Sequence, residues 1–157
     1  MMKKELDTAL VADFPKIFAN RYGDMRTTAM CWGFECDDGW EPLIRDLCTK
    51  LQKISDWEEH QVVALQVKEK FGELRFYIHG GTDIQWAVIE QAESRSTSTC
   101  EICGQRGSTR SDRGWLKTLC PKHAHENGYW LYDFEAEKLG LKKGEYIDKD
   151  DLDKEDS

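Results

Sequence analysis

The clearest periodic pattern in the chain is a set of apolar positions between residues 40 and 54. Positions three and four residues apart lie on one face of an α-helix, so this spacing predicts a long amphipathic helix that packs on the core. Asp37 or Asp38 is placed to cap its start, and Pro42 falls in its first turn, where proline is tolerated. The apolar positions are Trp40, Leu43, Ile44, Leu47, Cys48, Leu51 and Ile54.

Two later segments, residues 61–67 and 74–79, are rich in β-branched and aromatic side chains and predict a pair of strands. The connection between them contains Gly72, as a β-hairpin requires, and apolar residues alternate with polar ones in the second segment. We therefore expect an antiparallel hairpin with one face on the long helix. Thr82 and Gln85 then form a capping-box pattern, which predicts a further helix.

The remaining patterns are weaker. Residues 5–20 suggest a helix that is broken or kinked near Pro15, and residues 22–38 have no sustained period and predict a loop with short turns. Residues 94–99 form a short polar connector. Taken together, the elements predict an α+β fold: a small unit of helices and an antiparallel β-hairpin in residues 1–97, followed by a separate C-terminal module.

That module is marked by Cys100, Cys103, Cys120 and His123. Two residues separate the members of each pair, so both pairs can reach one tetrahedral ion, and cysteine and histidine are the preferred ligands of zinc. The four residues therefore predict a structural zinc site that leaves no position open for a substrate. His125 is the alternative fourth ligand, but on a helix it lies about 140° around the axis from Cys120, which favours His123.

The residues around these ligands predict a finger with a defined order of elements. Gly104 follows the first ligand pair, Gly107 and Gly114 punctuate a short hairpin, and Pro121 opens a helix. In this order the segment resembles a treble-clef zinc finger over residues 98–128. That resemblance is compatible with nucleic-acid binding, protein binding or catalysis. The HNH nucleases of this class need histidines on the hairpin, and residues 105–119 contain none.

Charge is distributed unevenly along the 157 residues, which carry a net charge of -8. Residues 94–132 contain six Lys and Arg residues against three Asp and Glu residues, so only this segment is basic. Cations on a finger can meet phosphate oxygens, or they can simply keep a small module soluble. The nucleic-acid-binding residues predicted by the first interpretation are Arg106, Arg110, Arg113 and Lys117.

The segment after the finger contains a cluster of aromatic residues between Tyr129 and Phe134, which we expect to dock on the core. The domain organisation predicted is residues 1–97 for the α+β unit, 98–134 for the finger with its docking segment, and 135–157 for an acidic tail. The tail has little apolar content, and from about residue 142 onward we expect it to be mobile.

The chain as a whole resembles small uncharacterised proteins of bacteriophages and prophages. The resemblance spans approximately residues 14–124 and rests on the Gly39-Trp40 helix start, a Lys-Phe-Gly-Glu-Leu-Arg-Phe-Tyr strand at residues 70–77, and the two ligand motifs. It implies a phage context without an assigned activity. The amino terminus lacks the apolar stretch of a secretory signal, and no window reaches the roughly 18 apolar residues that span a bilayer, so we expect a cytoplasmic location.

Two functions are consistent with these patterns. The first is a non-catalytic accessory protein that binds a bacterial or phage protein, and thereby inhibits or redirects a host or antiviral-defence component. The second is an accessory protein that binds nucleic acid through the basic finger. No nucleophile elbow, phosphate loop or HExxH helix occurs in the sequence, so no enzymatic activity is predicted.

Overall fold

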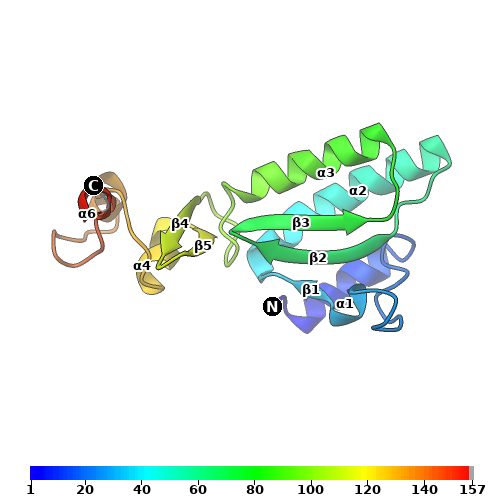
Figure 1. Ribbon diagram of the computed structural model, residues 1–157, viewed down its shortest axis with the longest axis horizontal. Coiled ribbons are helices and arrows are strands. Elements are labelled where there is room, and N and C mark those ends of the chain that lie inside the picture. The colour runs from blue at the N-terminus through cyan, green and yellow to red at the C-terminus, as the bar shows by residue number, and fades with distance from the viewer. Residues whose placement is uncertain (156–157) are drawn as a thin grey trace.

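The computed structural model describes residues 1–155. Its N-terminal unit is a three-stranded sheet in the order β1-β2-β3, in which β1 is parallel to β2 and β2 is antiparallel to β3. Helices α2 and α3 lie side by side along this sheet (Figure 1). The elements are α1 (Lys4–Asp13), a 3-10 turn η1 (Met30–Trp32), β1 (Phe34–Glu35), a 3-10 turn η2 (Asp38–Trp40), α2 (Glu41–Glu58), β2 (Ala64–Lys70), β3 (Glu73–Ile78) and α3 (Asp83–Ser96).

The core of this unit is made by the residues whose periodicity predicted the elements. The apolar face of α2 is buried in the core, with Ile44 and Leu47 at most 1% exposed, and Trp40 at the end of η2 is fully buried beside it. The capping box of α3 is present: the Thr82 hydroxyl accepts a hydrogen bond from the amide of Gln85, whose side chain accepts one from the amide of Thr82. Both predicted helices are therefore confirmed.

The predicted hairpin is confirmed, but its connection is shorter than the sequence suggested. Strand β2 ends at Lys70 and strand β3 begins at Glu73, which leaves only Phe71 and Gly72 in the turn. Both residues have positive φ angles, 55° and 80°, as in a type I′ turn, whose twist matches that of the flanking strands. The turn was not recognised from the sequence because this geometry normally takes Asn-Gly or Asp-Gly.

Two N-terminal segments differ from the expectation. Helix α1 ends at Asp13, two residues before Pro15, which confirms the predicted break, but residues 15–20 then form turns and do not resume the helix. In the predicted loop over residues 22–38, the turn η1 agrees with the expected short turns, but the short strand β1 was not expected. A two-residue strand has no readable period, and its pairing with β2 depends on partners more than 30 residues away.

The C-terminal unit lies beyond the turn of the β2–β3 hairpin (Figure 1). It consists of the antiparallel hairpin β4 (Ser108–Asp112) and β5 (Trp115–Leu119), followed by α4 (Pro121–Glu126), α5 (Asp133–Lys138) and α6 (Lys149–Glu155). Its own small core contains Leu119, Ala124 and Leu131. The order of hairpin and helix agrees with the predicted finger. Among the described residues, no helix combines the length and apolar character needed to cross a bilayer.

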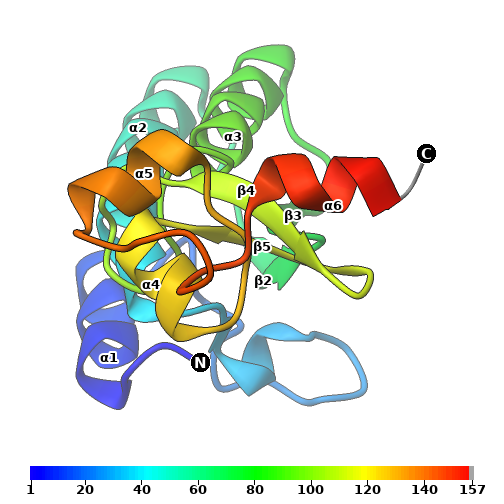
Figure 2. The ribbon, with the colours of Figure 1, turned by 90° about the vertical axis from the view of Figure 1, so that its left-hand side faces the viewer.

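The segment predicted as a tail is partly built into this unit. Glu135 and Ala136 of α5 are buried. Leu131 forms an isolated parallel bridge with Asp148, in which its amide donates to the carbonyl oxygen of Ile147 and its carbonyl oxygen accepts from the amide of Lys149. The predicted boundary at residue 134 therefore cuts through α5. Helix α6, the last helix before the C-terminus in Figure 2, has no buried residue, which agrees with its low apolar content. Ser157 and its neighbour Asp156 lie outside the described residues.

Candidate metal centre

The two ligand pairs are held by two turns of backbone that face each other. Cys100 and Cys103 lie in a tight turn, in which the amide of Gly104 donates to the carbonyl oxygen of Cys100 at 2.8 Å and Gly104 has a φ of 80°. Cys120 is the N-cap residue of α4, and His123 lies in the first turn of that helix. A residue at the N-cap and one three positions later project toward the same side, which explains the CxxH spacing.

The four ligand atoms form a compact group, all within 4.8 Å of one another. The sulfur atoms of Cys103 and Cys120 are 3.8 Å apart, and Nδ1 of His123 is 3.2 Å from the sulfur of Cys120 and 3.6 Å from that of Cys100. A tetrahedral zinc ion with ordinary bond lengths separates two sulfurs by about 3.8 Å and a sulfur from a nitrogen by about 3.5 Å. The donor set and its spacing therefore fit a zinc ion, and the structure brings all four predicted ligands together.

The electrostatics of the cluster favour a bound cation. Burial by itself raises the pKa of the Cys100 thiol, but hydrogen bonds from the amides of Cys120, Cys103 and Ile102 outweigh it and lower the pKa overall. Burial and the neighbouring Cys100 raise the pKa of Cys120 to about 11. Without a positive charge, the second thiolate is thus disfavoured by the first. A divalent ion removes this conflict because it stabilises every thiolate that binds it.

The remaining histidine nitrogen also has a neighbour. Nε2 of His123 is 4.0 Å from a carboxylate oxygen of Glu126, one turn further along α4. A carboxylate beside the free nitrogen of a liganding histidine orients the ring and strengthens it as a ligand. His125, the rival ligand considered from the sequence, does not belong to the group of four.

Glu101, which lies between the first two ligands, attaches the metal-binding turn to the N-terminal unit. Its side chain is only 3% exposed and accepts hydrogen bonds from the amide of Asp37 at 3.1 Å and from the ammonium group of Lys117 at 3.1 Å. Burial raises the pKa of Glu101, and the nearby Lys117 counteracts this shift. Sequence reasoning missed this residue, because its partners lie 64 and 16 positions away.

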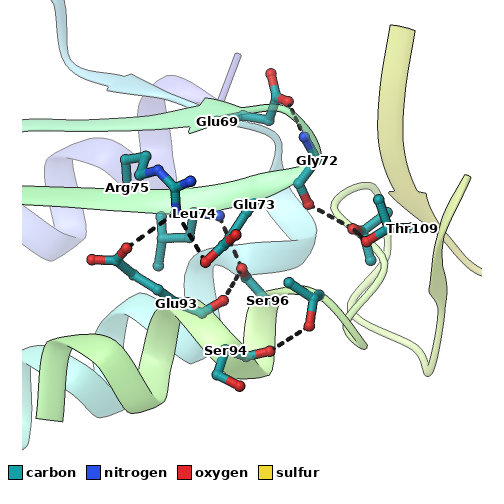
Figure 3. Close-up of polar contacts among 11 residues, drawn as sticks. Glu69, Gly72, Glu73, Leu74, Arg75, Glu93, Ser94, Ser96 and Thr109 are labelled. Atoms are coloured by element: carbon teal, nitrogen blue, oxygen red, sulfur yellow. Dashed lines mark hydrogen bonds and ion pairs between the residues drawn. The ribbon is translucent and has the colours of Figure 1, made fainter. Parts of the chain in front are cut away.

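A second polar contact joins the finger to the β2–β3 turn. The hydroxyl of Thr118 donates to the carbonyl oxygen of Gly72 at 2.6 Å and pairs with the hydroxyl of Thr109 at 2.7 Å. Figure 3 shows Gly72 facing Thr109, and on the other side of the turn Leu74 donates its amide to the hydroxyl of Ser96 at 2.9 Å. These contacts fix the position of Phe71 beside the finger.

The four cations predicted to contact nucleic acid do not form one surface. Arg110 is completely buried and donates two hydrogen bonds of 2.7 Å to the carboxylate of Glu135, so the prediction that it contacts phosphate is wrong. Lys117 is engaged by Glu101. Arg106 and Arg113 are exposed, and within residues 1–155 neither has an ion-pair partner. The Arg110–Glu135 pair could not be predicted from the sequence, because Glu135 lies in the segment that was predicted as a tail.

The aromatic cluster after α4 is divided between the interior and the surface. Trp130 is buried, with the guanidinium of Arg110 5.0 Å from its ring centre, whereas Tyr132 and Phe134 are exposed and stack on each other at 5.4 Å. The prediction that this cluster docks the segment therefore applies to Trp130 but not to Phe134. Comparisons of the chain with protein-family models, with characterised proteins and with solved structures found no match.

Proposed function

We propose that this protein is a zinc-binding accessory factor of phage type that acts by binding another protein and has no catalytic role. Its target, on this proposal, is a bacterial host or antiviral-defence protein, which it inhibits or redirects. The metal ligands support the structural part of the proposal, because four protein ligands complete a tetrahedral zinc ion and leave no position for a substrate. The phage context is supported by the sequence resemblance described above.

The observation that carries the protein-binding part concerns Phe71 and Trp115. Phe71 is 66% exposed and has a φ of 55°, a left-handed conformation that costs a bulky side chain about 1–2 kcal/mol. Trp115 is 77% exposed and follows the β4–β5 turn, in which Arg113 and Gly114 also have positive φ angles. Because both aromatic side chains are mostly exposed, neither contributes much to the stability of the fold by burial. Contact with a partner protein explains better why aromatic residues occupy these two positions.

These two side chains border one cavity, which we call the hairpin groove. It has a volume of about 550 Å³ and is also lined by Leu116, Tyr129 and Arg113. Tryptophan, tyrosine and arginine are the residues most enriched among those that dominate the energy of protein interfaces. The groove is therefore the surface to which the proposal assigns the main contact.

Affinity capture from a bacterial lysate tests the proposal if matched tryptophan variants are used. Trp57, at the C-terminal end of α2, is 77% exposed, as is Trp115, but does not line the hairpin groove. We expect wild type and Trp57→Ser to retain a stoichiometric protein complex and Trp115→Ser to lose it. Absence of any complex, or a complex that Trp115→Ser retains in full, would contradict the proposal.

The alternative function, nucleic-acid binding, is supported by the exposed and unpaired side chains of Arg106 and Arg113 within the described chain. Binding through these cations requires an affinity that falls steeply with salt, because each phosphate contact releases counterions. An Arg106→Gln/Arg113→Gln variant should then bind a random-sequence oligonucleotide more weakly. Binding that is indifferent to salt and to these substitutions would remove this alternative.

A further inference from the structure

A second cavity lies next to the metal centre, between the start of α4 and the end of α5. We call it the α4–α5 groove. Its volume is about 470 Å³, and Pro121 and Leu139 supply apolar surface to it beside the ligands Cys103 and Cys120. Leu139 and Cys103 are both exposed. The groove thus offers an apolar floor that no segment of the described chain covers.

Three cations rim this groove: Arg106, Lys122 and Lys138. All three are exposed, and within residues 1–155 none has a carboxylate oxygen within 4.0 Å. One carboxylate also lines the groove, that of Glu135, but both of its oxygens are held by Arg110 at 2.7 Å. The rim therefore presents three cations that form no ion pair among residues 1–155, on a chain whose net charge is -8.

The charge of the metal centre does not cancel this rim. Three thiolates and a neutral histidine around a divalent ion carry a net charge of -1, which leaves the groove positive. Opposite charges across an interface speed association and exclude wrong partners. The positive rim therefore requires a ligand with negative charge, and the apolar floor requires that the same ligand bury an apolar side chain.

A protein segment meets both requirements better than a nucleic acid does. A duplex carries one negative charge per about 1.7 Å along its length, so it would extend beyond the groove and meet the acidic remainder of the molecule. Glu126 and Glu137 lie on the same two helices as Lys122 and Lys138. A short peptide confines its carboxylates to the rim and can place an apolar side chain on the floor.

We propose that the α4–α5 groove binds an acidic segment of a partner protein, in which an apolar side chain rests between Pro121 and Leu139 while flanking carboxylates pair with Arg106, Lys122 and Lys138. This inference rests on the proposed function and deepens it, because it states the chemistry of the partner. It adds a second contact surface to the hairpin groove.

The test is selection of short displayed peptides of random sequence against the zinc-loaded full-length protein. The selected peptides are then measured with Lys122→Glu/Lys138→Glu and with the control Lys16→Glu/Lys53→Glu. Both double variants change the net charge equally, and Lys16 and Lys53 are exposed lysines of the N-terminal unit. We expect enrichment of peptides in which Asp or Glu flanks an apolar residue, an affinity loss of at least about tenfold in the groove variant, and no comparable loss in the control.

Three results would overturn the inference: no enrichment, enriched peptides without an acidic excess, or equal losses in both double variants. Random-sequence single-stranded and duplex oligonucleotides serve as competitors. An oligonucleotide that binds more tightly than the peptides and is released by Lys122→Glu/Lys138→Glu would identify a nucleic-acid surface and also overturn it. Failure of the proposed function gives a different result: acidic peptides would still bind the α4–α5 groove, but no complex captured from the lysate would depend on Trp115.

Discussion

The backbone amide of Gly39 donates a hydrogen bond of 2.7 Å to the carbonyl oxygen of Glu101. This contact brings η2 of the N-terminal unit against the metal-binding turn. A side chain at position 39 has no room, because a Cβ atom there would lie 2.3 Å from the carbonyl oxygen of Cys100 and 2.5 Å from that of Glu101. The indole N–H of the neighbouring Trp40 donates to the carbonyl oxygen of Thr99 at 2.8 Å, so a main-chain and a side-chain hydrogen bond join the two units at adjacent residues.

Substitution of Gly39 by alanine should therefore separate these segments. We expect the free energy of unfolding to fall by about 1–3 kcal/mol, since the added methyl group overlaps backbone atoms that cannot rotate away. Urea unfolding of the zinc-loaded protein measures this change. Gly80→Ala is the control, because no atom lies within 4 Å of the Cβ position there and only the φ of 72° opposes the substitution. A larger loss for Gly80→Ala would contradict the steric argument.

Removal of the metal should loosen the C-terminal unit before the N-terminal one. The main core of the protein, which includes Val67 and Phe76, lies outside the metal cluster, whereas the core around Leu119 includes two of its ligands. Loss of a residue that hydrogen-bonds to a metal ligand lowers metal affinity by roughly 10–100-fold. We expect Cys103→Ser, which removes a ligand itself, to lower zinc affinity further and to weaken amide protection over residues 98–138.

Hydrogen exchange measured before and after chelation locates this effect. Amides of β2 and β3 should stay protected while those of β4, β5 and α4 exchange faster. Cys31→Ser is the control, since Cys31 donates to the carbonyl oxygen of Thr28 at 3.3 Å and lies outside the group of four ligands. Uniform exchange across the whole chain, or none in the finger, would show that the metal does not act locally.

The metal cluster and α2 were predicted from the sequence because their signals are local. Cys100 and Cys103 are separated by only two residues within one turn, and the apolar face of α2 repeats within one helix. The contacts that place the finger are of another kind. Glu101 meets Asp37 across 64 residues and Arg110 meets Glu135 across 25, so each looked like an independent surface charge. Long-range pairs of this type carry no periodic pattern.

The same distinction explains the error about Arg110, whose partner Glu135 lies 25 positions away in the sequence. A cation in a basic segment reads as exposed until its buried partner is known, and Glu135 lies beyond the finger motif. Phe71 was missed for a different reason: the type I′ turn it occupies normally contains Asn or Gly, so the sequence contradicted the local geometry. Conflicts of this kind are expected where function constrains a residue.

The buried pair of Arg110 and Glu135 gives α5 a defined dependence on pH. Burial alone raises the pKa of Glu135, but the hydrogen bonds from Arg110 and from the amide of Tyr132 outweigh it and lower the pKa below its ordinary 4.5. A carboxyl group whose pKa is lower in the folded state contributes stability above pH 4.5, and that contribution is lost as pH falls through the folded pKa. Docking of α5 should therefore weaken on acidification below about pH 4.5.

Substitution Glu135→Gln isolates this effect. At neutral pH it should destabilise α5 by about 3 kcal/mol, because the buried guanidinium of Arg110 loses its counter-charge, and the dependence on acid below pH 4.5 should become flatter. Exchange of the Ala136 amide, which donates to the carbonyl oxygen of the N-cap residue Tyr132, reports on docking locally. Glu137→Gln on the exposed side of α5 should change stability by less than about 0.5 kcal/mol. Equal effects of the two substitutions would refute the assignment.

The left-handed conformation of Phe71 lowers the stability of the fold, whereas its exposed ring is proposed to bind the partner, so one substitution should change the two properties in opposite directions. Asparagine adopts a φ near 55° at lower cost, so Phe71→Asn should raise the free energy of unfolding by about 1 kcal/mol and abolish capture of the partner. Glu59, at the C-terminal end of α2, has a similar φ of 53°, and Glu59→Asn should stabilise the protein without affecting capture. Urea midpoints and the lysate assay measure both properties. If Phe71→Asn destabilises the fold, the aromatic ring is there for packing, and the argument for the hairpin groove fails.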